Sequence, residues 1–198
     1  MSLLIAIPIK PFGVAKARLS PLLDARARSQ LGRSVAAHTV QTALATGAKV
    51  AVVTSDDGVG RWAGALGAGV IREAPEFGGG LDGAAAAAVA ATAGITWLIL
   101  PADLPRLSPA DLDAAIARFR PNGYVLAPSY DGGTSLLMGR GPFPFSYGPG
   151  SFHRHLRAAG EGARVVVRTG LALDLDTPRD LAAARSLALA GVWHEIRA

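Results

Sequence analysis

Short runs of apolar residues alternate along the chain with longer segments of helical character. Residues 3–9 form a continuous apolar run, which is typical of a strand covered on both faces of its sheet. Residues 96–101 form the clearest second example. Five shorter runs predict further strands at 50–54, 70–73, 124–128, 135–138 and 165–168.

The segments between these runs predict helices, several of which begin at a residue that favours a helix N-terminus. Asp24 is expected to cap a long helix that runs to about Thr46, and Asp82 opens an alanine-rich helix after the loop 75–81. Further helices are expected at 59–66, at 108–119 with Ser108 as cap, at 151–159 with Ser151 as cap, and from Pro178 onward. Repeated strand–helix units predict one α/β domain over residues 1–198, with a mostly parallel central sheet.

Composition excludes several classes of protein. Half of the 198 residues are hydrophobic and 18% are charged, so we expect a packed core. The absence of cysteine excludes disulfides, thiolate metal sites and cysteine nucleophiles. The 20 lysine and arginine residues are scattered, so a net charge of +5 does not indicate a nucleic-acid partner. No export signal is evident, and with the lack of cysteine this favours the cytoplasm.

One uncharged stretch, residues 84–102, has roughly the length of a membrane span. Its first half is almost entirely alanine, Gly94 interrupts it, and its second half is a short β-branched and aromatic run. We therefore expect a buried helix followed by a buried strand, and no membrane partner.

Polar residues follow several of the predicted strands. Lys10 follows the first, residues 55–57 follow the second, Asp103 follows the strand 96–101, and Asp174 with Asp176 follows the last strand-like run. Ligands of parallel α/β sheets bind beyond the carboxyl ends of the strands. Carboxylates from separate strand ends, together with lysines, suit a divalent metal that holds a polyphosphate.

These residues also have structural interpretations. Asp103 could form a turn with the Leu-Pro pair that follows it, although we favour the ligand role. Strand alternation would send Asp174 and Asp176 to opposite faces, so one is expected as a ligand while the other caps the helix that starts at Pro178. We favour Asp176 as the cap or the ligand, and the choice stays open.

Other familiar signatures are absent. There is neither a GxxxxGK[ST] phosphate loop nor a GxGxxG after the first strand, which disfavours P-loop NTPases and dinucleotide oxidoreductases. His153 and His155 are two positions apart on a predicted helix and cannot share a metal, so we expect packing and surface roles for them. Ser151 lacks the GxSxG elbow of esterases, but a helix start after glycines can bind an anion.

Six short motifs resemble, in order, those of the 2-phospho-L-lactate guanylyltransferases, enzymes of deazaflavin coenzyme biosynthesis. They are IPIK at 7–10, AKARL at 15–19, PADLP at 101–105, GT at 133–134, YGPGSF at 147–152 and DLDTP at 174–178. The aromatic loop that ends in GPGSF is the most specific of them.

The resemblance implies a three-layer α/β/α sandwich with a mixed, mostly parallel sheet, the glycosyltransferase-A-like nucleotidyltransferase fold. It implies transfer of GMP from GTP to the phosphate of a three-carbon phospho-acid, with Mg²⁺ and with release of pyrophosphate. The implied site residues are Lys10, Lys16 and Asp103 for catalysis; Lys16, Arg18, Gly79, Gly80 and Asp82 for the nucleotide; Lys10, Thr134, Gly148 and Ser151 for the acceptor; and Asp103, Asp174 and Asp176 for the metal.

Two departures from the family pattern stand out. Asp82 stands where the family usually has asparagine, and Asp131-Gly132 precedes Gly133 where threonine or glycine is expected. Asp82 most simply caps its helix; as an alternative, its carboxylate could accept from the N1–H and N2–H of guanine.

Several questions stay open at this point. The acceptor could be phospholactate, phosphoenolpyruvate or 3-phosphoglycerate. Another nucleotidyltransferase acting on a molybdopterin or a sugar phosphate, and a non-catalytic nucleotide-binding protein, are the alternatives. A homodimer is compatible with the sequence, because the apolar loop 142–147 could cover the site or meet a partner.

Overall fold

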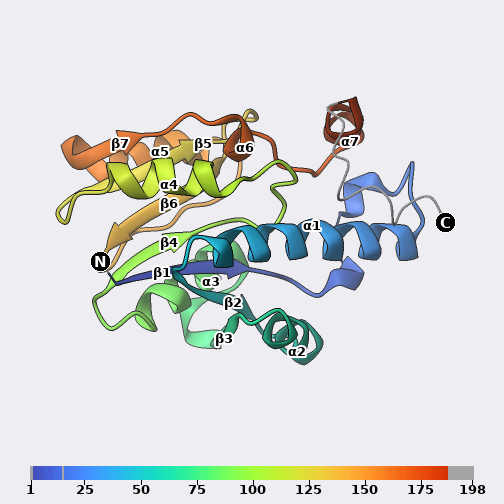
Figure 1. Cartoon of the computed structure of the whole chain (residues 1–198), viewed down its shortest axis with the longest axis horizontal. Helices are drawn as coiled ribbons and strands as arrows, with labels where there is room; N and C mark the ends of the chain where they lie inside the picture. Colours follow the sequence, from blue (N-terminus) through green and yellow to red (C-terminus); the bar gives the residue numbers. More distant parts are fainter. Residues whose placement is uncertain (1, 15, 187–198) are drawn as a thin grey trace.

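The computed structural model describes residues 2–14 and 16–186 of the chain. Its centre is one seven-stranded sheet in the order β3-β2-β1-β4-β6-β5-β7 (Figure 1). Strand β6 runs antiparallel to both β4 and β5, and every other pair is parallel. The strands are β1 (Leu3–Pro8), β2 (Lys49–Thr54), β3 (Gly69–Arg72), β4 (Thr96–Ile99), β5 (Tyr124–Pro128), β6 (Thr134–Arg140) and β7 (Ala163–Val165).

Helices cover both faces of the sheet. Side chains of α1, α2, α4 and α6 pack on one face, and side chains of α3 and α5 pack on the other. The α-helices are α1 (Ala25–Ala45), α2 (Asp57–Ala65), α3 (Gly80–Ala90), α4 (Pro109–Arg118), α5 (Ser151–Ala159), α6 (Thr169–Ala172) and α7 (Pro178–Ser186). Short 3₁₀ helices lie at Phe12–Val14, Ala17–Leu19, Pro75–Phe77 and Gly160–Gly162. The predicted three-layer sandwich with a mixed, mostly parallel sheet is confirmed.

A third apolar cluster lies away from the sheet and brings distant segments together. Leu19 from the loop after β1 packs with Leu175 and with residues of α1 and α7. In Figure 1 this loop and α7 lie at the same end of the molecule. Burial of these side chains holds the basic loop 16–18 beside the acidic segment 174–176.

Most of the expected elements are present, with small shifts at their ends. Asp24 caps α1 by accepting from the amide of Ala27 at 2.7 Å, as predicted. The strand expected at 165–168 lies instead at Ala163–Val165. The uncharged stretch 84–102 is a helix followed by a strand, and no helix in the described part of the chain is both long and apolar enough to cross a bilayer.

Two predicted helix caps are wrong by a few positions. Gly79 is the N-cap of α3, so Asp82 lies inside the first turn, and its carboxylate accepts instead from the amide of Tyr147. Gly150, in the left-handed conformation, is the N-cap of α5, and Ser151 is the first helical residue. In both cases the polar side chain bonds to a residue distant in sequence rather than to its own helix.

Candidate active site

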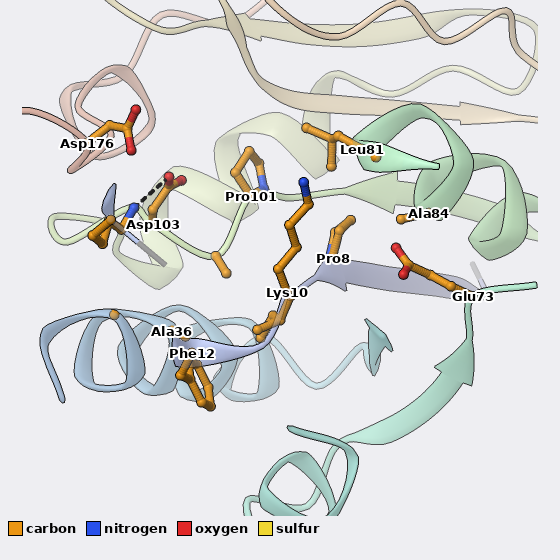
Figure 2. A pocket seen from close by; sticks show the side chains of 15 residues that line it. Pro8, Lys10, Phe12, Ala36, Glu73, Leu81, Ala84, Pro101, Asp103 and Asp176 are labelled. Atoms are coloured by element: carbon orange, nitrogen blue, oxygen red, sulfur yellow. Dashed lines mark hydrogen bonds and ion pairs between the residues drawn. The ribbon is translucent and has the colours of Figure 1, made fainter. Parts of the chain in front are cut away.

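Two cavities meet at the carboxyl ends of β1 and β4. The first, of about 380 Å³, is lined by Lys10 and is called the Lys10 cavity (Figure 2). The second, of about 370 Å³, is lined by Thr134 and is called the Thr134 cavity. The residues that line both are Leu81, Pro101, Asp103 and Asp176. Two predicted metal ligands therefore stand at the junction of the cavities.

A backbone hydrogen bond brings the two acidic segments together. The amide of Leu175 donates to the carbonyl oxygen of Asp103 at 2.9 Å. Because Leu175 is flanked by Asp174 and Asp176, this bond places all three carboxyl groups around one opening. All three line the Thr134 cavity. Residues 173–177 are not a strand, so the expected alternation of Asp174 and Asp176 to opposite faces does not apply.

Asp103 pairs with a lysine from the loop after β1. Lys16 Nζ lies 2.9 Å from Asp103 Oδ2, and the Lys16 side chain is only 8% exposed. Lys16 has a φ of +56°, the left-handed region, which directs the chain from one 3₁₀ helix into the next. The pairing joins two of the residues predicted for catalysis.

Asp176 pairs with the second basic residue of the same loop. Arg18 donates to Asp176 Oδ2 at 2.9 Å, and both side chains are well exposed. Arg18 lines the Thr134 cavity, whereas Lys16 lines the Lys10 cavity. The basic pair predicted for the triphosphate is thus divided between the two cavities.

Asp174 is the most perturbed carboxyl group of the site. Burial raises its pKa to about 7, and the charges of Asp103 and Asp131 act in the same direction. A cation beside these groups would restore the charged form, because it removes the repulsion between them.

Asp180 organises the start of α7, a role that sequence reasoning missed. Its carboxylate accepts from the amides of Asp176 and Thr177 at 2.9 and 2.6 Å and from the hydroxyl of Tyr130. Burial raises the pKa of Asp180, but these hydrogen bonds outweigh that effect and lower it overall. The amide of Asp180 donates to Thr177 Oγ1 at 3.3 Å, so Thr177 rather than Asp176 caps α7, and the side chain of Asp176 bonds to Arg18 and lines both cavities. The sequence signal was the spacing Thr177-x-x-Asp180, which is that of a capping box.

Thr134 and Ser151 form the far wall of the Thr134 cavity with Gly148. Thr134 Oγ1 lies 3.2 Å from Ser151 Oγ and 2.9 Å from His155 Nδ1. Gly148 has a φ of +112°, which only glycine adopts readily. Three of the four residues predicted for the acceptor thus lie together, and His155, for which packing was expected, is bonded to one of them.

The residues predicted for the nucleotide divide into two groups. Gly80 lines the Lys10 cavity, but Gly79 and Asp82 line neither cavity. The Oδ1 of Asp82 lies 2.6 Å from the amide of Tyr147, so it holds the aromatic loop 142–147 against α3. Phe143 of this loop is buried against Trp97.

Glu73 is the carboxylate of the Lys10 cavity that sequence reasoning missed. It follows β3 directly and lines the cavity together with Lys10, and Figure 2 shows both side chains extending into the space beside α3. The signal was available, because Glu73 stands at the end of a predicted strand like the other candidates. The polar residues 55–57 are not at the site: Asp56 caps α2, and Asp57 pairs with Arg72.

The acidic residues are not assembled into a ready metal site. Within residues 2–14 and 16–186, no three histidine, aspartate or glutamate side chains are grouped closely enough to hold an ion on their own. The metal role of Asp103, Asp174 and Asp176 stays a prediction. Carboxylates at a shared opening nevertheless suit a cation that takes few protein ligands and completes its shell with water and phosphate.

Comparison with known proteins identifies the family. The family model described as "Guanylyl transferase CofC like" matches residues 3–185. The chain belongs to this family. This match confirms the resemblance that the six motifs indicated, and it covers nearly the whole length of the chain.

Curated relatives of this CofC-like chain include proteins named for two acceptors. The phosphoenolpyruvate guanylyltransferase of Rubrobacter xylanophilus is 37% identical over all of this chain and 99% of its own. The 3-phospho-D-glycerate guanylyltransferase of Phenylobacterium zucineum is 39% identical over 84% of this chain and 82% of its own.

Solved structures confirm the fold. A protein of Desulfovibrio desulfuricans described as a nucleotide-diphospho-sugar transferase superposes with a TM-score of 0.76 at 15% identity, covering 100% of this chain and 92% of its own. Glucosyl-3-phosphoglycerate synthase of Mycobacterium tuberculosis, solved with Mn²⁺, UDP and phosphoglyceric acid, gives a TM-score of 0.61 at 14% identity, covering 98% of this chain and 78% of its own. At such identities the likeness concerns the architecture alone.

Proposed function

We propose that this chain transfers GMP from GTP to the phosphate of a small three-carbon phospho-acid and releases pyrophosphate. The observation that carries the proposal is the junction of the two cavities at Asp103 and Asp176. A nucleotide in one cavity and an acceptor in the other would meet beside these carboxylates. The names of the curated relatives support phosphoenolpyruvate and 3-phosphoglycerate as acceptors.

The Lys10 cavity is the proposed nucleotide site. Lys10 has no hydrogen-bonded or ionic partner among the described residues and extends into the cavity (Figure 2), so its charge is available to phosphate oxygens. Gly80 supplies backbone close to the ligand. Glu73 offers a carboxylate that could accept from the N1–H and N2–H of guanine. This role suits Glu73 better than Asp82, because Asp82 lies outside the cavity and already bonds to Tyr147.

The Thr134 cavity is the proposed acceptor site. Thr134 and Ser151 present hydroxyl groups, Gly148 allows close approach of the backbone, and Arg18 adds a positive charge at the rim. These groups match the carboxylate and phosphate oxygens of a phospho-acid. Lys10, which the sequence also assigned to the acceptor, lines only the other cavity.

The reaction needs no general base. An acceptor phosphate oxygen, already an anion at neutral pH, attacks the α-phosphorus of GTP. The new P–O bond forms as the bond from the α-phosphorus to the bridging oxygen breaks, and that oxygen leaves with pyrophosphate. The barrier arises from bringing two anions together and from charge on the leaving group. Lys16 and Arg18 are positioned to reduce this repulsion once they exchange carboxylates for phosphates.

The carboxyl groups fit a divalent cation, and we propose Mg²⁺. Asp103 and Asp176, with Asp174 beside them, would hold it, because magnesium prefers carboxylate oxygens. The ion would neutralise charge on the phosphates.

A pyrophosphate-release assay tests the proposal. GTP, Mg²⁺ and the purified protein are incubated in turn with phospholactate, phosphoenolpyruvate and 3-phosphoglycerate, and ATP replaces GTP as a control. Pyrophosphate released with GTP and one of these acids supports the proposal. Release with a sugar phosphate or a molybdopterin instead, or nucleotide binding without turnover, contradicts it. Deazaflavin coenzyme biosynthesis, a cytoplasmic location, a single domain and a homodimer stay predictions.

A further inference from the structure

A buried hydrogen-bond chain lies behind the wall of the Thr134 cavity. It runs from the amide of Ser146 to His155, then to Thr134 and Ser151. His155 is 0% exposed, and it does not line the cavity, whereas both hydroxyl residues do. Thr134 therefore links His155 to the cavity by a hydrogen bond.

The chain fixes which nitrogen of His155 carries the proton. The amide of Ser146 lies 2.9 Å from Nε2, and a backbone N–H can only donate. Nε2 must therefore be unprotonated, so the proton of the neutral ring is on Nδ1. Nδ1–H then donates to Thr134 Oγ1 at 2.9 Å.

This tautomer determines how many hydroxyl protons face the cavity. Thr134 and Ser151 have two hydroxyl protons between them, and the bond joining their oxygens uses one. Because His155 donates to Thr134, no hydroxyl proton is spent on the ring, and the second is left for a ligand. With the proton on Nε2, the hydroxyl proton of Thr134 would be donated to Nδ1. The hydroxyl proton of Ser151 would then be used in the Thr134–Ser151 bond, and none would be left for a ligand.

The surroundings of His155 keep it neutral. The rings of Phe143, Phe145 and Tyr147 lie within 5.7, 6.5 and 4.7 Å of it between centroids. Burial lowers its pKa to about 4. Two charged groups face it: Asp82 of α3 opposes this shift, and Arg154 of α5 adds to it.

We propose that His155 is a positioning residue that directs a hydroxyl proton of the Thr134–Ser151 pair toward an anionic oxygen of the acceptor. The proposal rests on the proposed function in taking the ligand of the Thr134 cavity to be a phospho-acid. It goes further by assigning acceptor affinity to a residue that does not touch the acceptor.

The tautomer is tested directly on the unaltered protein by ¹⁵N NMR of the histidine side chains at neutral pH. The His155 signals are identified by their loss in His155→Asn. We expect the neutral ring with its proton on Nδ1. A proton on Nε2, or a charged ring, overturns the proposal, and this outcome does not depend on enzymatic activity.

Two variants test the consequence for the acceptor. Asparagine places an amide N–H near the position of Nδ1, so His155→Asn keeps the donor to Thr134, whereas His155→Leu fills space without it. We expect His155→Leu to raise the KM for the acceptor about threefold to tenfold, because the Thr134 hydroxyl loses the donor that orients its proton. The KM for GTP should stay unchanged, and His155→Asn should recover most of the loss. His153→Leu, an exposed position on the same helix, is the matched control.

Equal effects of leucine and asparagine on the acceptor KM, or no effect of either, contradict the proposal, because packing alone would then explain His155. If leucine prevents folding, His155→Asn and the NMR measurement remain decisive. If the unaltered protein transfers no GMP, the proposed function fails. Calorimetric binding of phosphoenolpyruvate to the same variants then tests whether His155 controls an anion site.

Discussion

The ammonium group of Lys16 lies 2.9 Å from the carboxylate of Asp103, and the Lys16 side chain is almost completely buried. Arg18 makes the corresponding contact with Asp176. The basic residues proposed for the phosphates therefore pair with the carboxylates proposed for the metal. Metal and nucleotide are expected to bind together, because the nucleotide offers these cations new partners as the ion takes the carboxylates.

The first prediction concerns this competition. In Lys16→Met, Asp103 loses its ionic partner, so Mn²⁺ should bind the nucleotide-free protein about threefold to tenfold more tightly. Turnover should fall at the same time, because the phosphates lose a charge. Electron paramagnetic resonance of free Mn²⁺ measures the affinity. Lys49→Met, at an exposed position on β2, is the control, and weaker Mn²⁺ binding by Lys16→Met would contradict competition at Asp103.

The second prediction concerns Asp103 itself. Asp103→Asn should reduce turnover at least about a thousandfold while leaving the fold intact, because the amide is a poor ligand for a hard cation. Circular dichroism and thermal unfolding check the fold, and the pyrophosphate assay measures turnover. Asp113→Asn, an exposed carboxylate on α4, should change neither. Near-normal turnover in Asp103→Asn would remove it from the metal site.

The strands could be predicted from the sequence because burial on both faces leaves a direct trace in it. The runs at 3–9 and 96–101 correspond to β1 and β4, and the acidic residue beyond β4 is at the junction of the cavities. The antiparallel direction of β6 could not be predicted from its apolar run, because such a run indicates that a strand is buried but not which strand it pairs with or in which direction. The mixed sheet was predicted instead from the resemblance of the six motifs to those of a known family.

The errors at the site have a common physical cause. Asp82 and Ser151 stand close to helix starts, where their side chains favour capping, so local reasoning made them caps. Each bonds instead to a residue distant in sequence, Asp82 to the amide of Tyr147 and Ser151 to Thr134. His155 was missed for the same reason, because its importance lies in two partners that only the fold brings near.

The third prediction concerns recognition of the base. Glu73→Gln should lower the preference for GTP over ATP, because one of the two carboxylate oxygens that accept from guanine is replaced by an NH₂ group, which donates. Asp82→Asn should leave the preference unchanged, since its amide oxygen can still accept from Tyr147. The ratio of kcat/KM for the two nucleotides measures both variants. A loss of preference in Asp82→Asn alone would restore Asp82 as the residue that reads guanine.

The last prediction concerns pH and stability. The pKa of His155 falls from an ordinary 6.5 to about 4 in the folded protein, chiefly because burial disfavours the charged ring. Between these values the unfolded chain binds a proton that the folded chain does not, so the free energy of unfolding decreases as the pH drops from 6.5 toward 4. Urea unfolding at pH 7.5 and pH 4.5 should show His155→Asn losing less stability than the unaltered protein, by on the order of 2 kcal/mol. His153→Asn controls for an exposed histidine, and equal losses in all three proteins would mean that His155 titrates normally and is not held neutral by its surroundings.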